Sequence, residues 1–331
     1  MGAGATGLRA AVSESSSRTP ATREPVTVIV TVRNEADSVG RLVESLVRGD
    51  VAPAEIVIAD GGSSDGTLER LREIATSEPR LKPLSAPGNR SVGRNAAVRA
   101  ARNDVIACTD AGVEVDPAWL AEITRPFAED PATDVVAGFY RPDGATSFER
   151  AAGVVSAPAL RELNADRFLP STRSVAFRRA AFEKVGGFDE SLAHNEDTPF
   201  ALALKSSGAR FAFAPDAIVR WRPRGTLRAF VHQHRRFGIG DGESRVQAWF
   251  YRTLAAKYAL ALGLAILGIW FRPAWWLLAI GIILFIAQQA RRGSGRVPLF
   301  SAIFVVPFLK IAYDLAYLSG YLRGRLGPRA K

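Results

Sequence analysis

Carboxylates gather where apolar segments of this sequence end, and such clusters can bind metal ions, accept protons or form turns. The stretch IVIADGGSSDGT at 56–67 ends an apolar run with Asp60 and Asp65, and the run at 26–32 is followed by RNEAD, which contributes Glu35. Gly, Ser and Asp are common turn and N-cap residues, so one such loop by itself is consistent with a structural role. Two such loops after neighbouring strands would line one polar crevice, which favours ligand binding.

The elements that must position these loops follow from the apolar pattern. The runs VTVIVTV at 26–32 and EIVIAD at 55–60 predict strands covered on both faces. Between them we expect an amphipathic helix, capped by Asp37 or Ser38, whose apolar stripe is Val39, Leu42, Val43, Leu46 and Val47. This order makes the strands parallel, and ligands of such sheets bind at the carboxyl ends of the strands. Both polar loops are therefore predicted at one edge.

A third strand is predicted at 104–110, after a helix at 91–101 that carries Arg94. This strand ends on Asp110. A carboxylate in this place can hold Mg²⁺ or Mn²⁺ against a diphosphate, because these ions prefer hard oxygen ligands. The alternative is that Asp110 only caps a turn.

Two more helix starts carry carboxylates. Asp116 is expected to cap a helix that begins at Pro117. The segment HNEDTPFALALKSSG places Glu196 and Asp197 at the start of another helix, which is anchored in the core by Phe200, Leu202 and Leu204. Carboxylates at a helix N-terminus are favourable for the helix dipole alone, so a structural role for this pair stays open.

Six segments follow one another in an order known from one enzyme family: VTVIVTVRNEADSVGRLVESL, EIVIADGGSSDGT, GRNAA, CTDAG, AFRRAAFEKVGGFDE and NEDTPFALAL. In this order they resemble family 2 of the glycosyltransferases, which have the GT-A fold. The resemblance covers about residues 26–237. It implies an α/β nucleotide-sugar-binding domain with a mostly parallel sheet. It also implies an inverting transfer of a sugar from a nucleoside diphosphate sugar to an acceptor hydroxyl.

The resemblance assigns roles to individual residues. Asp197 would be the general base, with Glu196 as the next candidate, and Arg236 would bind the leaving diphosphate. The residues expected to bind the nucleotide sugar are Val32, Glu35, Asp60, Asp65, Arg94, Asp110 and Gln233. The chemistry agrees, because inversion at an anomeric carbon needs a carboxylate that takes the acceptor proton and positive charge on the leaving diphosphate.

Asp110 would also be the metal ligand, but here the sequence departs from the family. The usual Asp-any-Asp motif is DAG, with Gly112 in place of the second carboxylate. The expected cofactor, Mg²⁺ or Mn²⁺, would be held by Asp110 with help from water, the diphosphate and another side chain, or metal dependence would be weak. Candidate helpers are His194, His232 and Glu114, each of which is also an ordinary polar residue.

The segment QHRRF at 233–237 resembles the Gln-any-any-Arg-Trp motif of membrane-bound processive members of the family. Gln233 and Arg236 match, and Phe237 replaces the usual Trp. The longer stretch HQHRRFGIGDGESR is more similar to the connector of exopolysaccharide-building transferases related to the succinoglycan enzymes. A basic face resting on anionic lipid headgroups is a compatible interpretation.

Composition limits the class of protein. The chain has 331 residues, 47% of them hydrophobic, and a formal net charge of +10, so a packed core and an anionic partner are expected. Its single cysteine, Cys108, cannot form an intramolecular disulfide, so no oxidising compartment is needed. Nucleic acid is not the predicted partner, because the basic residues flank apolar segments instead of forming a soluble basic helix.

The last third of the chain predicts membrane attachment. Two apolar runs at 258–271 and 274–289 are separated by Arg272 and Pro273. A spanning helix needs about 20 apolar residues, so each run is short. They would form a tight hairpin, or spans extended by a snorkelling Lys257. A third run at 299–322 is interrupted by Pro307, Lys310 and Asp314.

The basic segments 291–296 and 323–331 flank the third run, and the positive-inside rule puts both on the cytoplasmic side. Two spans with a re-entrant or interfacial third segment satisfy this rule, whereas three full spans do not. We therefore expect a protein of the cell membrane whose catalytic domain is cytoplasmic.

The expected organisation has five parts: a flexible tail at 1–24, the GT-A domain at 25–221, a basic connector that completes the active site at 222–252, membrane helices at 253–322 and a basic tail at 323–331. The expected function is sugar transfer from a nucleoside diphosphate sugar to a lipid-linked or polysaccharide acceptor. The alternatives are a polyprenyl-phosphate sugar synthase and a non-catalytic membrane protein that binds nucleotide sugars.

Overall fold

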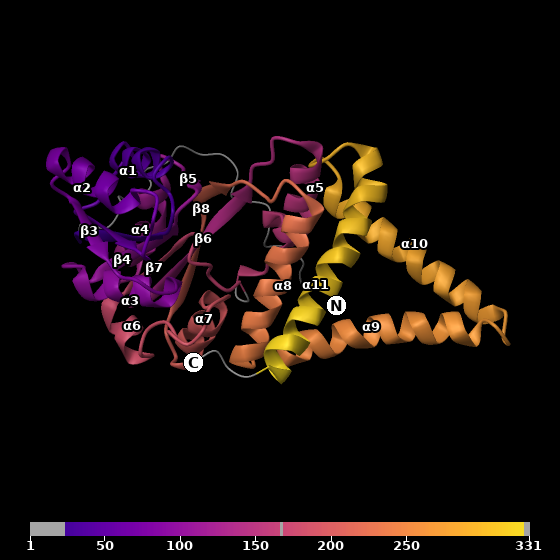
Figure 1. The fold of residues 1–331 in the computed structure, drawn as a ribbon. Coiled ribbons are helices and arrows are strands. Elements are labelled where there is room, and N and C mark those ends of the chain that lie inside the picture. Colours follow the sequence, from indigo (N-terminus) through magenta and orange to yellow (C-terminus); the bar gives the residue numbers. More distant parts are fainter. Residues whose placement is uncertain (1–23, 166–167, 328–331) are drawn as a thin grey trace, which may run out of the picture.

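The computed structural model describes residues 24–165 and 168–327. A sheet of eight strands forms the centre of the N-terminal part, in the order β3-β2-β1-β4-β7-β6-β8-β5 (Figure 1). Its strands are β1 (Val26–Val32), β2 (Glu55–Asp60), β3 (Leu81–Ser85), β4 (Val105–Asp110), β5 (Val113–Val115), β6 (Val135–Pro142), β7 (Val175–Arg178) and β8 (Phe211–Trp221). The predicted tail at 1–24 lies outside the described residues except for Glu24, as does the end of the chain from 328.

The sheet is mixed. Strands β3, β2, β1 and β4 are parallel, as predicted, but β7 runs antiparallel to both β4 and β6, and β5 runs antiparallel to β8. In the register, Val32 lies opposite Asp60, and Thr31 lies opposite Asp110. The carboxyl ends of β1, β2 and β4 therefore meet at one edge, and the loops that follow them are brought together.

Helices cover both faces of the sheet, and the alternation of side chains along β1 explains why. Val28 and Val30 pack into a core with α1 (Val39–Val47), α2 (Thr67–Ser77) and α4 (Trp119–Glu129). Ile29 points to the opposite face, where α3 (Arg90–Ala100), α6 (Arg179–Lys184) and α7 (Asp197–Ser206) pack. A strand buried on both faces reads as a continuous apolar run, which is the pattern that predicted it.

The predicted strands at 26–32 and 55–60 are confirmed, but two helix starts differ from the prediction. Helix α3 begins at Arg90 because the side chain of Asn89 caps it by accepting from the Val92 N–H. Helix α4 begins at Trp119, two residues after the predicted Pro117. The reason is a turn in which the Trp119 N–H donates to the Asp116 carbonyl at 2.8 Å.

Helices α8 (Leu227–Ser244) and α11 (Val306–Leu326) pack together with α5 (Ser147–Ser156) in an apolar cluster beside the sheet. Helix α8 occupies most of the predicted basic connector, and α11, which follows the π-helical turn Ser301–Val305, packs along it. The backbones approach closely, since a Cβ added at Gly320 would lie 2.1 Å from the Arg235 carbonyl oxygen. Val306 and Leu309 are buried against residues of α5 and α8.

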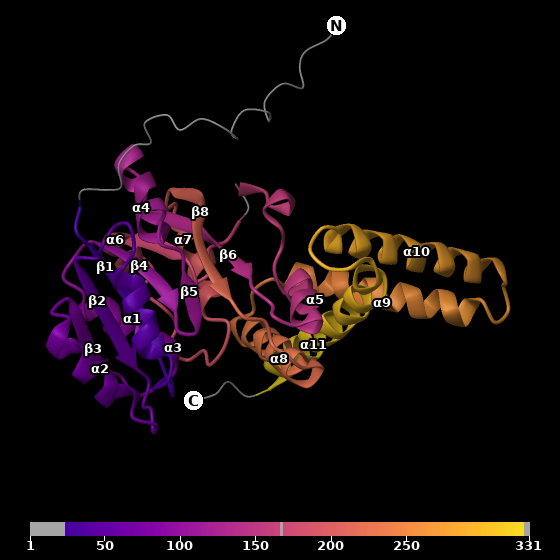
Figure 2. The same ribbon diagram turned by 90° about the horizontal axis from the view of Figure 1, so that it is seen from above.

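Helices α9 (Ala248–Leu267) and α10 (Pro273–Gly293) form a hairpin that extends away from the sheet (Figures 1 and 2). The predicted boundary at 252/253 falls inside α9. Both helices are longer than the apolar runs that predicted them, because each continues into flanking polar residues. Together with Ser301–Leu326, they are three helices long and apolar enough to cross a membrane.

The third apolar helix differs from the hairpin in how much of it is covered. Over an apolar stretch of 18 residues in this helix, 39% of the residues are buried, compared with 11% in each hairpin helix. One face of Ser301–Leu326 packs on α5 and α8, and the opposite face exposes Phe304, Phe308, Ile311, Leu315 and Leu322. Ser301–Leu326 therefore exposes apolar residues along one side only, whereas the hairpin helices are exposed over most of their surface.

Candidate active site

A cavity of about 630 Å³ opens at the edge where β1 and β4 end. Its walls come from the loops after these strands, from the start of α7, and from α8 and α11. The charged residues that line it are Glu35, Arg90, Arg94, Asp110, Arg173, Glu196, Asp197, Arg222, Arg224, Arg236 and Asp241. The sheet edge predicted to bind ligands is therefore hollow and highly charged.

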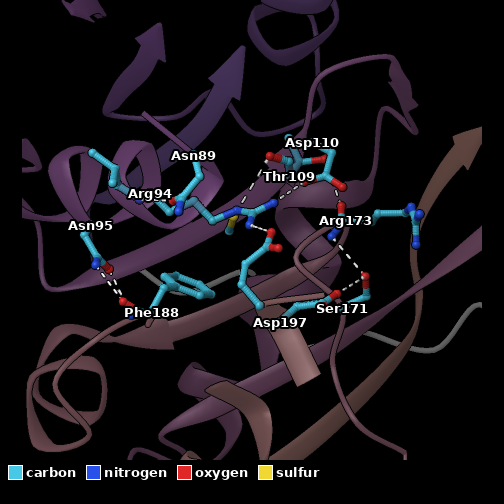
Figure 3. A network of polar contacts seen from close by, with 12 residues as sticks. Asn89, Arg94, Asn95, Thr109, Asp110, Ser171, Arg173, Phe188 and Asp197 are labelled. Carbon is cyan, nitrogen blue, oxygen red and sulfur yellow. Dashed lines mark hydrogen bonds and ion pairs between the residues drawn. The ribbon is translucent and has the colours of Figure 1, made fainter. Parts of the chain in front are cut away.

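Arg94 connects the two halves of this site (Figure 3). Its side chain is only 1% exposed, and it donates hydrogen bonds to Asp110 at 2.8 Å and to Glu196. A buried guanidinium requires such partners, because an unpaired charge is costly in the interior. The end of β4 and the start of α7 are thereby held together.

Asp110 keeps its negative charge in this environment. Burial by itself would raise its pKa, but the positive charges of Arg94, Arg173 and Arg90 outweigh burial and hold the pKa below its usual value. Its side chain is 28% exposed and borders the cavity. Asp110 thus presents an ionised oxygen ligand to a molecule bound there.

The pKa of Asp197 is shifted in the opposite direction, upward. Burial raises its pKa, and the nearby carboxylate of Glu196 raises it further, against the opposing charges of Arg94 and Arg173. The only hydrogen bond described for its carboxylate comes from the Ser171 hydroxyl, at 3.0 Å. A carboxylate with a raised pKa and spare acceptor capacity is suited to take a proton.

Several arginines in the cavity have no carboxylate within ion-pair distance in the described part of the chain: Arg90, Arg173, Arg224 and Arg236. Arg173 lies over the rings of Tyr140 and Trp221, at 5.4 and 5.1 Å. The pKa of Arg236 is lowered by burial and by the charges of Arg90 and Arg224. Such converging positive charges suit a diphosphate.

Arg236 also contacts His194, since its Nε donates to His194 Nε2 at 3.1 Å. The pKa of His194 is lowered by burial and by the charge of Arg236, which favours the neutral ring that accepts this bond. Nε2 of His194 is therefore occupied by Arg236. His232 and Glu114, the other predicted metal helpers, are exposed and lie outside the described lining of the cavity.

The structure brings together most of the predicted site residues. Those that border the cavity are Glu35, Arg94, Asp110, Glu196, Asp197, Gln233 and Arg236. Val32, Asp60 and Asp65 are not among the described residues of its lining. Their assignment to the nucleotide sugar stays a prediction.

The two carboxylates of DGGSSDG serve the loops themselves. Asp60 accepts from the backbone N–H groups of Gly62 and Ser63, at 3.2 and 3.0 Å. Asp65 accepts from the N–H of Ala36 at 3.1 Å, which ties this loop to the one after β1. The turn-forming role left open for these residues is therefore present, and it holds Glu35 at the cavity.

Sequence reasoning missed other residues of the site. Arg173 and Ser171 lie in an irregular loop, and Tyr140 and Trp221 come from β6 and β8, far apart in the sequence. The polar segment STRS at 171–174, before β7, is the one sequence feature that could have pointed to Arg173.

Comparisons with known proteins agree with this geometry. The family described as Glycosyl transferase family 2 matches residues 27–186. The chain is 29% identical to the succinoglycan biosynthesis protein ExoA of Rhizobium meliloti, over 66% of this chain and 68% of that protein. It is 25% identical to the glycosyltransferase AglE of Haloferax volcanii, over 73% of this chain and 80% of that protein.

Among solved structures, the chain is similar to the mannosyltransferase PcManGT from Pyrobaculum calidifontis in complex with GDP-Man and Mn²⁺. The TM-score is 0.63 with 22% identity, and the similarity covers 90% of this chain and 88% of that one. At this identity the likeness shows the fold. Residues 27–186 thus belong to the family 2 glycosyltransferases, and the chain is a glycosyltransferase with the GT-A fold.

Proposed function

We propose that the protein transfers a sugar, with inversion, from a nucleoside diphosphate sugar to a lipid-linked or polysaccharide acceptor at the cytoplasmic face of the membrane. The observation that carries this proposal is the contrast inside the cavity between two carboxylates. Asp197 has a raised pKa, whereas Asp110 stays ionised beside Arg94. One group can accept a proton while the other side of the site binds the leaving group.

In the proposed reaction Asp197 takes the proton of the acceptor hydroxyl as that oxygen attacks the anomeric carbon. The bond from this carbon to the diphosphate breaks, and the nucleoside diphosphate leaves. Ser171 orients Asp197 through its hydrogen bond. Glu196 is less suited to the role of base than was predicted, because its carboxylate is occupied by buried Arg94.

The positive charges of Arg90, Arg173, Arg224 and Arg236 would stabilise the leaving diphosphate. Arg236 keeps the role predicted for it, and Gln233 lies one helical turn before it on α8. Glu35 would contact the base or ribose from the loop after β1.

Asp110 fits a divalent cation as a single carboxylate ligand. Gly112 supplies no second carboxylate, and the described residues include no group of three or more His, Cys, Asp or Glu side chains placed to hold a metal ion. Mg²⁺ commonly binds through one or two carboxylates with substrate phosphates and water, so Mg²⁺ or Mn²⁺ would enter with the diphosphate. When bound, the ion would neutralise charge on the leaving group.

The acceptor would enter from the side of the C-terminal helices. There the cavity is lined by the aromatic residues Phe237, Phe250, Tyr313 and Tyr317. These belong to α8, α9 and α11, and α9 and α11 are among the helices long and apolar enough to cross a membrane. The relative named for succinoglycan biosynthesis supports a polysaccharide acceptor.

A donor and metal screen tests the proposal. Purified full-length protein in detergent would be incubated with UDP-, GDP- and dTDP-sugars, with and without Mn²⁺, and transfer to a membrane lipid extract would be measured. We expect one donor class to be used, with a product of opposite anomeric configuration as seen by NMR. Transfer to polyprenyl phosphate itself would favour the polyprenyl-phosphate sugar synthase. Nucleotide binding without turnover would favour the non-catalytic alternative.

A further inference from the structure

A chain of hydrogen bonds links residues 193–198, which lead into α7 and are called the catalytic loop below, to α9, the first apolar helix. Asp241, on α8, is only 1% exposed. Its Oδ1 accepts from Asn195 Nδ2 at 2.5 Å, and its Oδ2 accepts from the Tyr251 hydroxyl at 2.6 Å. Asn195 lies two residues before Asp197, and Tyr251 lies in the first turn of α9.

The partner of Asp241 in the loop has an unusual backbone. Asn195 has a φ of 56°, a left-handed conformation that asparagine tolerates better than most residues. Its side chain also donates to the Thr198 hydroxyl, at 3.3 Å. The side-chain bonds of Asn195 therefore fix the backbone from which α7 and Asp197 start.

A second, independent observation places α8 directly against this loop. A Cβ added at Gly240 would lie 2.0 Å from the carbonyl oxygen of His194, so no larger residue fits there. The turn from α8 into α9 is equally constrained, with left-handed residues at Arg245 and Gln247. Tyr251 in turn stacks on Tyr321 of α11, with ring centroids 3.8 Å apart.

We propose that Asp241 is a positioning residue, which sets the orientation of Asp197 through Asn195 and is itself held by Tyr251 of the apolar hairpin. The catalytic loop is then ordered by the helix that leads into the membrane. This role rests on the proposed function of Asp197 as the base. The mechanical part, the ordering of residues 193–198, does not depend on it.

Helix α9 offers a matched control. Tyr258 lies seven residues after Tyr251, and its hydroxyl likewise donates to a buried carboxylate, that of Asp314 at 3.0 Å. Asp314 belongs to α11 and has no described contact with the catalytic loop. Tyr251→Phe and Tyr258→Phe each remove one hydroxyl from the same helix, and only the first breaks the proposed link.

The experiment uses full-length protein in lipid nanodiscs and compares Tyr251→Phe, Asp241→Asn, Asn195→Gly and Tyr258→Phe with the wild type. Glycine in place of Asn195 can adopt the left-handed backbone and removes the whole side chain that reaches Asp241. Hydrogen–deuterium exchange of residues 193–198 should be faster by about tenfold or more in the first three variants and unchanged in Tyr258→Phe. Equal exchange in all variants, or equal acceleration in both tyrosine variants, would overturn the proposal.

Transfer kinetics, with the UDP-, GDP- or dTDP-sugar that the wild type uses, give the second readout. A small displacement of a catalytic group lowers the rate strongly, so kcat should fall at least about tenfold in Tyr251→Phe while KM for the donor stays within about twofold. An unchanged kcat with faster exchange would also overturn the positioning role. If the wild type transfers no sugar, the proposed function fails, and the exchange data still decide whether the link orders the loop.

Discussion

Glu196 and Asp197 are neighbours in the sequence, but their carboxylates interact with different partners. Glu196 is ion-paired with buried Arg94, and Asp197 accepts a hydrogen bond from Ser171 and faces the cavity. The start of α7 turns one carboxylate toward the core and leaves the other for chemistry. This division explains how two adjacent acids can have different roles.

The Arg94 ion pairs should dominate local stability. Arg94→Met would leave Asp110 and Glu196 without their buried counter-charge, which typically costs about 3–5 kcal/mol. Chemical unfolding in detergent measures the loss. The control is Arg48→Met, which breaks an exposed pair with Glu44 and should cost at most about 1 kcal/mol. Similar losses in both variants would contradict the structural role of Arg94.

Asp110→Asn should weaken donor binding and abolish stimulation by Mn²⁺ or Mg²⁺. Losing one hydrogen bond to a charged group costs about 1.5–3 kcal/mol, so donor affinity should fall at least about tenfold. Isothermal titration with the nucleotide of the active donor, with and without Mn²⁺, measures both effects. Asp116→Asn is the control, because Asp116 pairs with Arg220 outside the described lining of the cavity. A normal metal response in Asp110→Asn would place the metal site elsewhere.

His234 should make stability fall at acid pH. It is buried, and burial followed by the charges of Arg173 and Lys310 lowers its pKa to about 4, against the bond to the Phe230 carbonyl. The folded protein therefore favours the neutral ring. Its contribution is complete above the usual pKa of about 6.5 and is lost as pH falls toward 4, by up to about 3 kcal/mol.

Unfolding experiments between pH 8 and 4 test this dependence. His234→Gln should flatten the difference between neutral and acid pH. The exposed His232 on the same helix gives the control, because His232→Gln should follow the wild type. An unchanged slope in His234→Gln would show that another group is responsible.

The hairpin of α9 and α10 should insert into lipid. Leu262 and Ile283 are each 63% exposed, so Leu262→Asp with Ile283→Asp would place two charges in the bilayer, at about 2.5–3.5 kcal/mol each. Flotation with phosphatidylcholine–phosphatidylglycerol liposomes should show a much smaller bound fraction. Leu160→Asp, at an exposed leucine of the catalytic domain, should float like the wild type. Equal flotation of all three would exclude the hairpin as the anchor.

The sequence predicted those parts of the fold that depend on local pattern. The mainly apolar runs identified β1 and β2, because a strand covered on both faces is apolar at nearly every position. The start of α4 was wrong because the turn at Asp116 competes with a proline start, and a single dipeptide does not show which is preferred.

The site was predicted where residues stand at strand ends and was missed where distant segments meet. Asp110 ends a predicted strand and Asp197 begins a predicted helix, and both border the cavity. Arg173 comes from an irregular loop and is oriented by rings from β6 and β8, so only tertiary packing reveals it. Asp241 lies in the predicted basic connector, and the sequence around it does not show that Asn195 and Tyr251 both donate hydrogen bonds to it.

The most direct test of the central claim is the transfer rate of Asp197→Asn. The substitution keeps the shape of the side chain, and its amide oxygen can still accept from Ser171, but it removes the base. We predict near-normal melting temperature and donor affinity, with kcat reduced by about 10² to 10⁴. Asp189→Asn, at an exposed aspartate before α7, is the control and should keep full activity. Turnover of Asp197→Asn within a few-fold of the wild type would remove Asp197 from the mechanism.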